Sequence, residues 1–525
     1  MKQGTTGATD TARRASLDTP FETMRRERLA YGLFAFGGIF SYYLVMSYLQ
    51  KFLTDSGIAA VTVGVIFVIS KIWDAVIDPV FGVTVDRVNL RGGKYKPWLR
   101  AASIAIPITT VFMFIMPLNI SLPGKVLWAL AANLLWGTCY TMYDTPTNSS
   151  ATTMTANTYE RNFLFSLTAF FVYLGGIIVA IVVPMLYPTI GWTATGIVMA
   201  VLCALNMLWL PLFVKERHAT TAQSDLNVRD IVGSLLHNKY LLIFVGTAVI
   251  GQSTNFGLTL NVYLAEDVFG GPDWMTLITL ASALPVLITA LFVPKIIARF
   301  EKFWVYIVTV CVSMAMNLII FLVGFGHPWI VVALIFVRSF FDSFAIVASA
   351  TFVADCIEYA QFTMGVRAQG IAFSMKSFMN KLIVAITGAL AMFGLQIFGY
   401  REGAGIVQSA TTTNGIWFLC TFMPLVGAAL SLIIFHFYRI RSADVKLMIL
   451  ANKGEISHDE AETGLSAALR ADVRKAAARA SRASKGAVAE ARAPKTGAVT
   501  TKGPKAEVAV AEKGTTAARQ VGVSK

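Results

Sequence analysis

The chain has 525 residues, of which 56% are hydrophobic and only 14% are charged. Soluble domains typically contain about 45–50% apolar and about 25% charged residues, so the composition excludes an ordinary soluble protein and favours a membrane protein. The net charge of +14 comes from basic residues in loops and in a C-terminal tail. We therefore expect a lipid bilayer and no nucleic acid among its partners. The five cysteines are scattered through apolar stretches and predict no metal site.

Apolar stretches of about 20 residues, the length that crosses a bilayer as a helix, recur along the whole chain. We predict twelve membrane-spanning helices, near residues 28–52, 60–85, 99–118, 125–146, 163–187, 194–214, 240–264, 274–294, 303–324, 329–354, 371–397 and 414–438. The polar segments between them are short, which predicts an all-α membrane protein rather than a set of separate domains.

Positive charge is concentrated in alternate loops between these spans. Basic residues precede the first span, follow the second, fill the central loop, follow the eighth and follow the last, for example Arg25, Lys96, Lys215, Lys302 and Arg439. Lys and Arg are retained on the cytoplasmic side of membrane proteins. The pattern therefore predicts a multi-pass protein of the cell (inner) membrane with both termini in the cytoplasm.

The chain divides into two similar parts. Six spans precede the polar segment 215–239 and six follow it, and the basic loop after the second span has a counterpart after the eighth. Such repeats indicate a transporter that binds its substrate between the halves, near the bilayer midplane. The predicted organisation is a cytoplasmic segment 1–27, an N-terminal half 28–214, a central loop 215–239, a C-terminal half 240–440 and a basic cytoplasmic tail 441–525. The tail has almost no aromatic residues, so we expect it to be disordered.

Two aspartates, Asp74 and Asp78, lie one helical turn apart inside the second span and therefore point from the same face. A carboxylate in hydrocarbon is costly unless it faces a cavity or a partner. Two on one face repel each other unless a proton or a metal cation lies between them. The pair therefore predicts a cation-coupling site.

Short motifs follow one another in a fixed order over residues 28–440. They are Ala30-Tyr-Gly, Trp73-Asp-Ala-Val-Ile-Asp-Pro79, Asp86-Arg, Gly93-Lys-Tyr-Lys-Pro-Trp98, Thr141-Met-Tyr-Asp-Thr-Pro146, Glu160-Arg161, Ala354-Asp-Cys-Ile-Glu-Tyr359, Gly365-Val-Arg-Ala-Gln-Gly370 and Lys381 before Gly399-Tyr400. In these motifs the sequence resembles the glycoside–pentoside–hexuronide:cation symporters, a family that includes melibiose permease. The resemblance implies the major facilitator fold, with twelve transmembrane helices in two six-helix halves.

The resemblance also implies where the ligands bind. It places a cation at Asp74, Asp78 and Thr141, a sugar contact at Asp144, and a lysine close to both sites at Lys381. A buried lysine beside three carboxylates competes with the cation for negative charge. Competition of this kind links two ligands through one free energy, so we expect Lys381 and Asp144 to couple them.

Three departures from the family pattern change these expectations. Ile77 stands where the family commonly has an asparagine between the two acids, which removes an oxygen ligand for Na⁺ and favours H⁺ as the coupling ion. Ile39 replaces a sugar-binding acid of the first helix, and the positions of the partnering arginine and the stacking tryptophan hold Thr168 or Ala169 and Asn148. The side chains that bind a galactoside in this family are therefore largely absent.

Arg338 and Asp342, at positions i and i+4 of the tenth span, are candidates for the missing substrate contacts. They either form a fixed interhelical salt bridge or bind hydroxyls or an acidic group of the substrate. Further candidate substrate contacts are the aromatic and amide residues Tyr42, Tyr140, Asn255 and Trp417.

Charged residues near the cytoplasmic helix ends are expected to act in gating or in structure. They are Asp86, Arg87, Arg91, Lys94, Asp355 and Arg367. A charge network among them would steady the outward-facing state by tying helix ends together.

The resemblance favours a symporter, not an enzyme, that imports a glycoside or oligosaccharide with H⁺ or Na⁺ by alternating access. We expect it to be a monomer with no cofactor other than the coupling ion. Two alternatives stay open. One is a lysolipid:Na⁺ symporter of the same superfamily branch, which the missing sugar contacts favour. The other is an intramembrane aspartyl protease. The second acid of such a protease should directly follow Gly-x-Gly, and no Gly-x-Gly-Asp occurs in this sequence.

Overall fold

The computed structural model describes residues 21–88, 90, 92–155, 157–218, 238–290, 300–364 and 369–475. The regular secondary structure of these residues is helical throughout. In the N-terminal half the elements are α2 (Arg25–Tyr43), η1 (Leu44–Tyr48), α3 (Leu49–Asp55), α4 (Ala60–Arg87), α5 (Lys96–Phe114), α6 (Leu122–Met154), α7 (Thr158–Met207) and α8 (Trp209–Phe213). In the C-terminal half they are α10 (Lys239–Ser253), α11 (Gly257–Tyr263), η2 (Leu264–Val268), α12 (Asp273–Ala290), α14 (Lys302–Val323), α15 (Pro328–Met364), α16 (Gln369–Ile397) and α17 (Ala410–Phe435).

Each of the twelve predicted spans overlaps a helix of the described residues. Among the residues that the structure describes, eight helices are long and apolar enough to cross a membrane by length and composition, and the shorter α10 and α12 are also apolar. The element α7 consists of two helices that meet at a kink at Gly191, where φ is 80°, and they correspond to the fifth predicted span and most of the sixth. Glycine suits this left-handed backbone because it has no side chain to clash with the preceding carbonyl.

The first and the seventh predicted spans share a local irregularity. The π-helical turn η1 lies inside the first span, and η2 begins at the last residue of the seventh. Single π-helical turns inside membrane or soluble helices are frequently found at functional sites.

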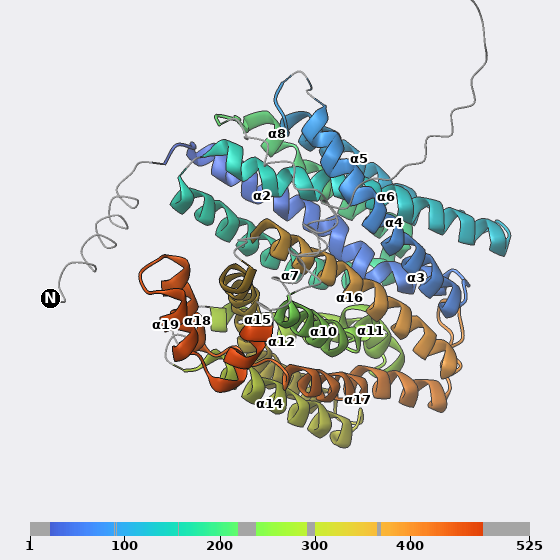
Figure 1. Ribbon diagram of the computed structural model, residues 1–525. Helices are drawn as coiled ribbons and strands as arrows, with labels where there is room; N and C mark the ends of the chain where they lie inside the picture. The colour runs from blue at the N-terminus through green and yellow to red at the C-terminus, as the bar shows by residue number, and fades with distance from the viewer. Residues whose placement is uncertain are drawn as a thin grey trace, which may run out of the picture. The chain divides into compact units, whose positions relative to one another are not determined.

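The helices of the two halves lie side by side. Figure 1 shows α2 to α8, in blue and green, on one side of α16, and α10, α12, α14 and α17 on the other. The halves contact each other chiefly through α4 with α16, through α7 with α12 and through η1 with α11. The largest group of buried apolar side chains includes residues of both halves, among them Tyr48, Trp136 and Tyr263.

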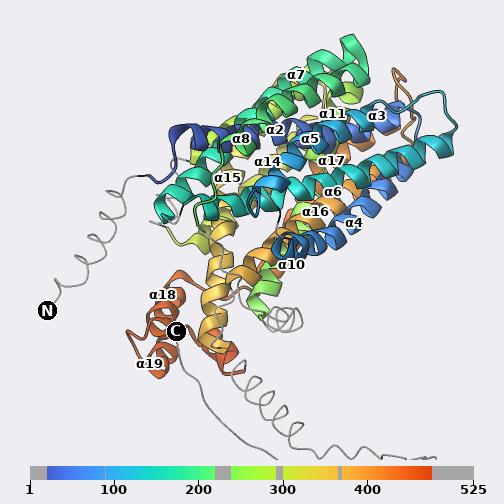
Figure 2. The same cartoon turned by 90° about the horizontal axis from the view of Figure 1, so that it is seen from above.

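The residues after the last span differ from the prediction. Two further helices, α18 (Ser442–Asn452) and α19 (His458–Gly464), are followed by a helical stretch over 467–475. Figure 2 shows α18 and α19 beside one end of α15. There Asn452 donates to the Glu358 carboxylate at 2.9 Å, and the His458 ring stacks on Phe362 with 4.0 Å between centroids.

The prediction of disorder from residue 441 onwards is therefore wrong for residues 442–475. The average composition of the tail concealed a periodic set of apolar side chains that are buried against the C-terminal half, namely Val445, Met448, Ala461, Leu465, Leu469 and Val473. Burial of such a face stabilises short helices that would be marginal alone. The rest of the predicted tail, residues 476–525, lies outside the described residues.

Candidate functional site

Helices α4, α6 and α16 bring three of the predicted site residues together. Asp78 on α4 accepts a hydrogen bond from the Thr141 hydroxyl on α6, with 2.8 Å between the oxygens. The other oxygen of the same carboxylate forms an ion pair with the Lys381 ammonium group on α16. Asp78 and Lys381 belong to different halves, so this ion pair crosses the interface between them. A cation or proton that binds Asp78 must compete with Lys381 for its charge.

Asp74, one turn before Asp78, has a different partner. Its carboxylate pairs with Lys71 on the same helix at 2.8 Å. Lys71 was not among the predicted site residues, although a cation three residues before an intramembrane acid is a recognisable signal. Asp74 also lies tightly against α6, because a Cβ atom at Gly137 would be only 2.5 Å from its Oδ1 atom. A side chain at position 137 would displace this carboxylate.

Asp144 is not brought into the ion pair of Asp78. Its carboxylate accepts a hydrogen bond from the Asn148 amide one turn further along α6, at 3.2 Å. The lysine and the three predicted carboxylates therefore divide into three local arrangements: Lys71 with Asp74, Lys381 with Asp78, and Asn148 with Asp144.

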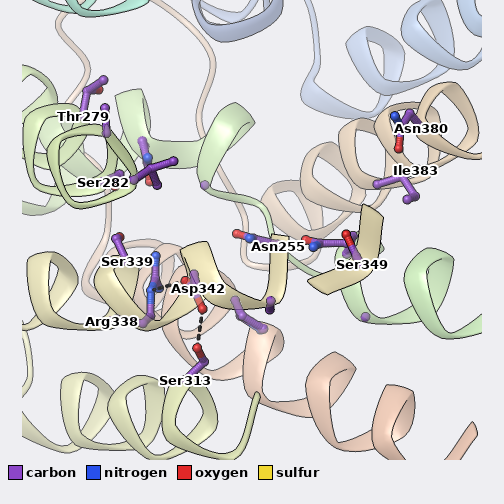
Figure 3. Close-up of a pocket in the computed structure, with 18 of the residues that line it drawn as sticks. Asn255, Thr279, Ser282, Ser313, Arg338, Ser339, Asp342, Ser349, Asn380 and Ile383 are labelled. Atoms are coloured by element: carbon purple, nitrogen blue, oxygen red, sulfur yellow. Dashed lines mark hydrogen bonds and ion pairs between the residues drawn. The ribbon is translucent and has the colours of Figure 1, made fainter. Parts of the chain in front are cut away.

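A cavity of about 910 Å³ lies between the two halves. This volume is at the upper end of the range typical of small-molecule sites. The N-terminal half contributes Tyr43, Ser47 and Tyr173, and the C-terminal half contributes most of the polar lining. Of the predicted substrate contacts, Arg338, Asp342 and Asn255 line it; further polar residues are Gln252, Asn261, Thr279, Ser282, Ser313, Asn317, Ser339, Ser349 and Asn380. Figure 3 shows several of these side chains around the cavity.

Arg338 and Asp342 are each held by the neighbouring helix α14. The Arg338 guanidinium donates to the Asn317 side-chain oxygen at 2.8 Å, and the Ser313 hydroxyl donates to the Asp342 carboxylate. The two charged groups face each other with 3.5 Å between Nε and Oδ2. Sequence reasoning missed Ser313 and Asn317, which are four residues apart like the pair they hold. Polar residues at that spacing in a span were the available signal.

The aromatic residues predicted to bind substrate are not among the described side chains that line this cavity. Tyr140 packs between Trp136 and Tyr42, with centroid distances of 5.0 and 5.3 Å. Trp417 is buried, and its indole nitrogen lies 3.4 Å from the Phe321 carbonyl oxygen. Their packing contributes to the helix core.

A cluster of charged and aromatic groups joins the two halves at the end of the bundle away from the described N-terminal residues. Lys51 pairs with Asp55 at 2.6 Å and, across the interface, with Glu266 at 3.0 Å. Glu266 also accepts a hydrogen bond from the Tyr187 hydroxyl, and Thr54 and Tyr263 share one at 3.1 Å. These contacts close the bundle at this end. This cluster was not predicted from the sequence.

At the opposite end, the described ion pairs are formed within each half. Lys302 pairs with Asp355 at 2.5 Å between α14 and α15. Lys94 is held at its backbone, where Glu216 accepts N–H bonds from residues 94, 95 and 96 and satisfies free donors at the start of α5. Of the other predicted gating residues, Arg91 and Arg367 lie outside the described residues, as do the side chains of Asp86 and Arg87.

Glu160, at the same end, fastens the segment before the first span. It is fully buried and accepts hydrogen bonds from the backbone N–H groups of Glu22 and Thr23, both at 2.9 Å, and from the Thr155 hydroxyl. Burial acts to raise the pKa of Glu160, but the hydrogen bonds from Thr23 and Thr155 outweigh it, so the pKa lies below its ordinary value. The carboxylate is thus held in its charged form.

The helical fold and the cavity between its two halves are typical of a membrane transporter. The family model described as MFS/sugar transport protein matches residues 30–442. The chain therefore belongs to the MFS/sugar transport protein family. This confirms the resemblance to the glycoside:cation symporters, and it means that the chain is a transporter and not an enzyme. The interpretation as an intramembrane protease is wrong.

Individual relatives agree with this assignment. The chain is 29% identical over 439 residues to the uncharacterized symporter YjmB of Bacillus subtilis, which covers 80% of the chain and 94% of the relative. It is 28% identical to the isoprimeverose transporter of Lactiplantibacillus pentosus, over 80% and 90% of the two chains. Among solved structures, the nucleoside transporter NupG matches 78% of this chain and 99% of its own, with 14% identity and a TM-score of 0.57. This last likeness supports the fold alone.

Proposed function

We propose that the protein imports a glycoside together with a proton by alternating access, with Asp78 as the coupling carboxylate. The single observation that carries the proposal is the ion pair between Asp78 and Lys381, which joins the two halves beside the substrate cavity. Asn380, the neighbour of Lys381, lines that cavity. Binding of a proton to Asp78 would release Lys381 and loosen this contact, so that helix positions and protonation are linked.

Two features support H⁺ rather than Na⁺. Na⁺ needs several oxygen ligands, whereas a proton needs one carboxylate. Asp78 is engaged by Lys381 and Thr141, Asp74 by Lys71, and the intervening Ile77 has no oxygen to offer. Each acid with its own lysine forms a neutral pair, and a protonated acid would leave the lysine free to move.

The conformation fits one stage of such a cycle. The contacts of Lys51 with Glu266 and of Thr54 with Tyr263 tie the halves together at the end that we assign to the outside of the cell membrane. The described ion pairs at the end that carries the termini do not cross between the halves. We therefore assign this arrangement to a state that is closed outward, with both termini cytoplasmic.

A glycoside suits the cavity better than a lysolipid does. The C-terminal half lines it with amides and hydroxyls, which bind sugar hydroxyls and would be left without partners by an acyl chain. The relative named as an isoprimeverose transporter supports the same substrate class. Uptake tests the choice: proteoliposomes with the purified protein are loaded with unlabelled compound and exposed to labelled glycosides or labelled lysolipid. We expect counterflow of a glycoside; counterflow of lysolipid alone would contradict the proposal.

A further inference from the structure

We propose that the charged cluster at the outer end of the bundle is a pH-sensitive latch, which holds the outer side closed in acid and releases it as the pH rises. The cluster consists of Lys51 and Asp55 on α3 and of Glu266 and Asp267 in η2. The inference goes beyond the proposed function, because it concerns closure of the outer side and depends on neither the substrate nor the coupling carboxylate Asp78.

Two of the three acids in the cluster are bound by its single ammonium group. Lys51 contacts Asp55 at 2.6 Å within the N-terminal half and Glu266 at 3.0 Å across the interface. Glu266 also accepts a hydrogen bond from the Tyr187 hydroxyl, so two side chains of the N-terminal half hold it. The Lys51 and Asp55 side chains are buried, and that of Glu266 is largely so. These contacts exist only while the halves are close together at this end.

Asp267 is the third acid, and it is held less well. Its hydrogen bond from the Tyr400 hydroxyl is long, with 3.4 Å between the oxygens. One positive charge against three negative charges leaves an excess of two in the cluster. Like charges in a partly buried place repel each other, and an acid relieves the repulsion when it takes up a proton. Because Glu266 and Asp267 are neighbours in the chain, such a proton belongs to the pair.

The pKa values of the two acids agree with uptake of a proton in the closed arrangement. Both residues lie just beyond the seventh predicted span. Burial raises the pKa of Glu266 from 4.5 to about 7 and that of Asp267 from 3.8 to about 6, although the charge of Lys51 opposes both shifts. Repulsion from Asp55 adds to both.

The remaining titratable groups that face the cluster are tyrosines. They are Tyr48, Tyr187, Tyr263 and Tyr400. Tyrosine ordinarily titrates near pH 10, so these side chains do not change charge where the acids do. The charge of the cluster in weak acid is therefore set by its carboxyl groups.

The direction of the effect follows from the two states. When the halves separate at this end, water reaches the acids and their pKa values return towards the ordinary ones. The closed state then binds more protons than the open state between about pH 4 and pH 7. Closure is thus favoured in acid, and the advantage is lost as the pH rises through the pKa values of the closed state. Because one pKa unit is a tenfold change in an equilibrium, we expect the balance to move by roughly tenfold between about pH 5 and about pH 8.

Distances between spin labels across the outer end measure this balance. The labels are attached in Leu118→Cys/Val407→Cys, at loop positions on opposite halves whose native side chains are 59% and 89% exposed. Cys311, the exposed one of the native cysteines, is replaced by serine in every protein. Purified protein in lipid nanodiscs, without substrate, is compared at about pH 5 and about pH 8. We expect mainly a short distance in acid, and a longer distance whose share relative to the short one is roughly tenfold greater at the higher pH.

Substitutions assign the effect to the cluster. Asp267→Asn removes one of the excess charges and should keep the outer end closed at both pH values. Glu266→Gln/Asp267→Asn removes both acids of the pair and should show no dependence on pH. Asp273→Asn, at an exposed acid on the same side, is the matched control and should behave like the wild type. Asp78→Asn should also retain the dependence, which separates the latch from proton coupling.

Three results would overturn the inference. Equal distance distributions at both pH values in the wild type would show that no latch operates. A dependence that survives in Glu266→Gln/Asp267→Asn would place the titrating group elsewhere. A dependence that is lost in Asp78→Asn would assign it to the coupling carboxylate instead. Glycoside counterflow tests the proposed function separately, so either one can fail while the other stands.

Discussion

The Lys381 ammonium group on α16 is paired with the Asp78 carboxylate on α4, and the two helices belong to opposite halves of the protein. An ion pair in this position is strong only while the halves are close together, because its energy falls with distance and with access of water. Whatever binds Asp78 therefore also acts on the contact between the halves. This is the physical link that a symporter needs between its ion and its conformational change.

Removal of the lysine should separate transport from accumulation. In Lys381→Ala, Asp78 loses its ion-pair partner. The lysine and the coupling cation then no longer compete for this carboxylate, so movement of the substrate no longer depends on the cation. We expect counterflow of labelled sugar to continue while gradient-driven accumulation is lost. Lys125→Ala is the matched control, since this lysine donates only to the Ser56 carbonyl at 2.9 Å among the described contacts. Accumulation at the wild-type level in Lys381→Ala would contradict the coupling role.

An oxygen ligand at position 77 should change the ion that is used. Ile77→Asn places a side-chain carbonyl between Asp74 and Asp78 and adds one of the ligands that Na⁺ prefers. We expect Na⁺ to stimulate uptake in this variant at pH 7 and to have little effect on the wild type. Ile77→Leu keeps the volume without the oxygen and serves as the control. If the wild-type protein responds strongly to Na⁺, the assignment of H⁺ is wrong.

The outer cluster should hold the protein closed on that side. Lys51→Glu and Glu266→Lys each place like charges together in a largely buried site, which costs several kcal/mol. Each variant should therefore favour the outward-open state. A cysteine at Ser47, on the cavity wall, would then react faster with an impermeant thiol reagent added from outside. The double variant restores an opposite pair and should slow the reaction again. Equal reaction rates in all four proteins would rule out a closing role for this pair.

Docking of the C-terminal helices should depend on the charge of Asp472. Burial acts against its ionisation, but hydrogen bonds from Lys239 and Tyr240 and the charge of Arg439 outweigh it, so the pKa of Asp472 is lowered from 3.8. A carboxylate with a lowered pKa contributes stability above its unfolded pKa and loses it as the pH falls through the folded value. The docked segment should thus be fully stable at neutral pH and come loose only in strong acid.

Asp472→Asn removes this charge at every pH. We expect faster tryptic cleavage near Arg470 at pH 7 in the variant than in the wild type, with no change for Glu455→Gln, whose exposed side chain pairs only loosely with Lys453 at 3.9 Å. Unchanged cleavage in Asp472→Asn would show that apolar contacts alone hold the segment.

The sequence was most informative where the membrane restricts which residues are tolerated, namely apolar residues along each span and few charged residues within it. Apolar length predicted the spans, the two acids predicted a cation site, and the family resemblance implied Thr141 and Lys381 as neighbours of Asp78, which the structure brings together. It was less informative about partners whose identity depends on helix rotation. Asp74 pairs with Lys71, and Asp144 accepts a hydrogen bond from Asn148, because each of these partners lies one turn away on the same helix as the acid. Those local contacts compete with the longer-range ones that the family resemblance implied.

Contacts between neighbouring helices could be predicted only in part. The four-residue spacing of Ser313 and Asn317 is visible in the sequence, but their partners became clear only once α14 and α15 were seen to lie in antiparallel register. The aromatic candidates Tyr42, Tyr140 and Trp417 had too little pattern to separate a sugar contact from ordinary packing. The helices after residue 441 were missed because average composition hides a short apolar period.

The most direct test of coupling uses Asp78→Asn in proteoliposomes with H⁺ and Na⁺ gradients imposed separately. A driving force equivalent to 100 mV is worth about 2.3 kcal/mol per charge, which corresponds to roughly 50-fold accumulation of substrate. We predict that the wild-type protein accumulates glycoside under the H⁺ gradient, and that Asp78→Asn inserts normally but only equilibrates it. Undiminished accumulation by Asp78→Asn under either gradient would contradict the assignment of Asp78 as the coupling carboxylate.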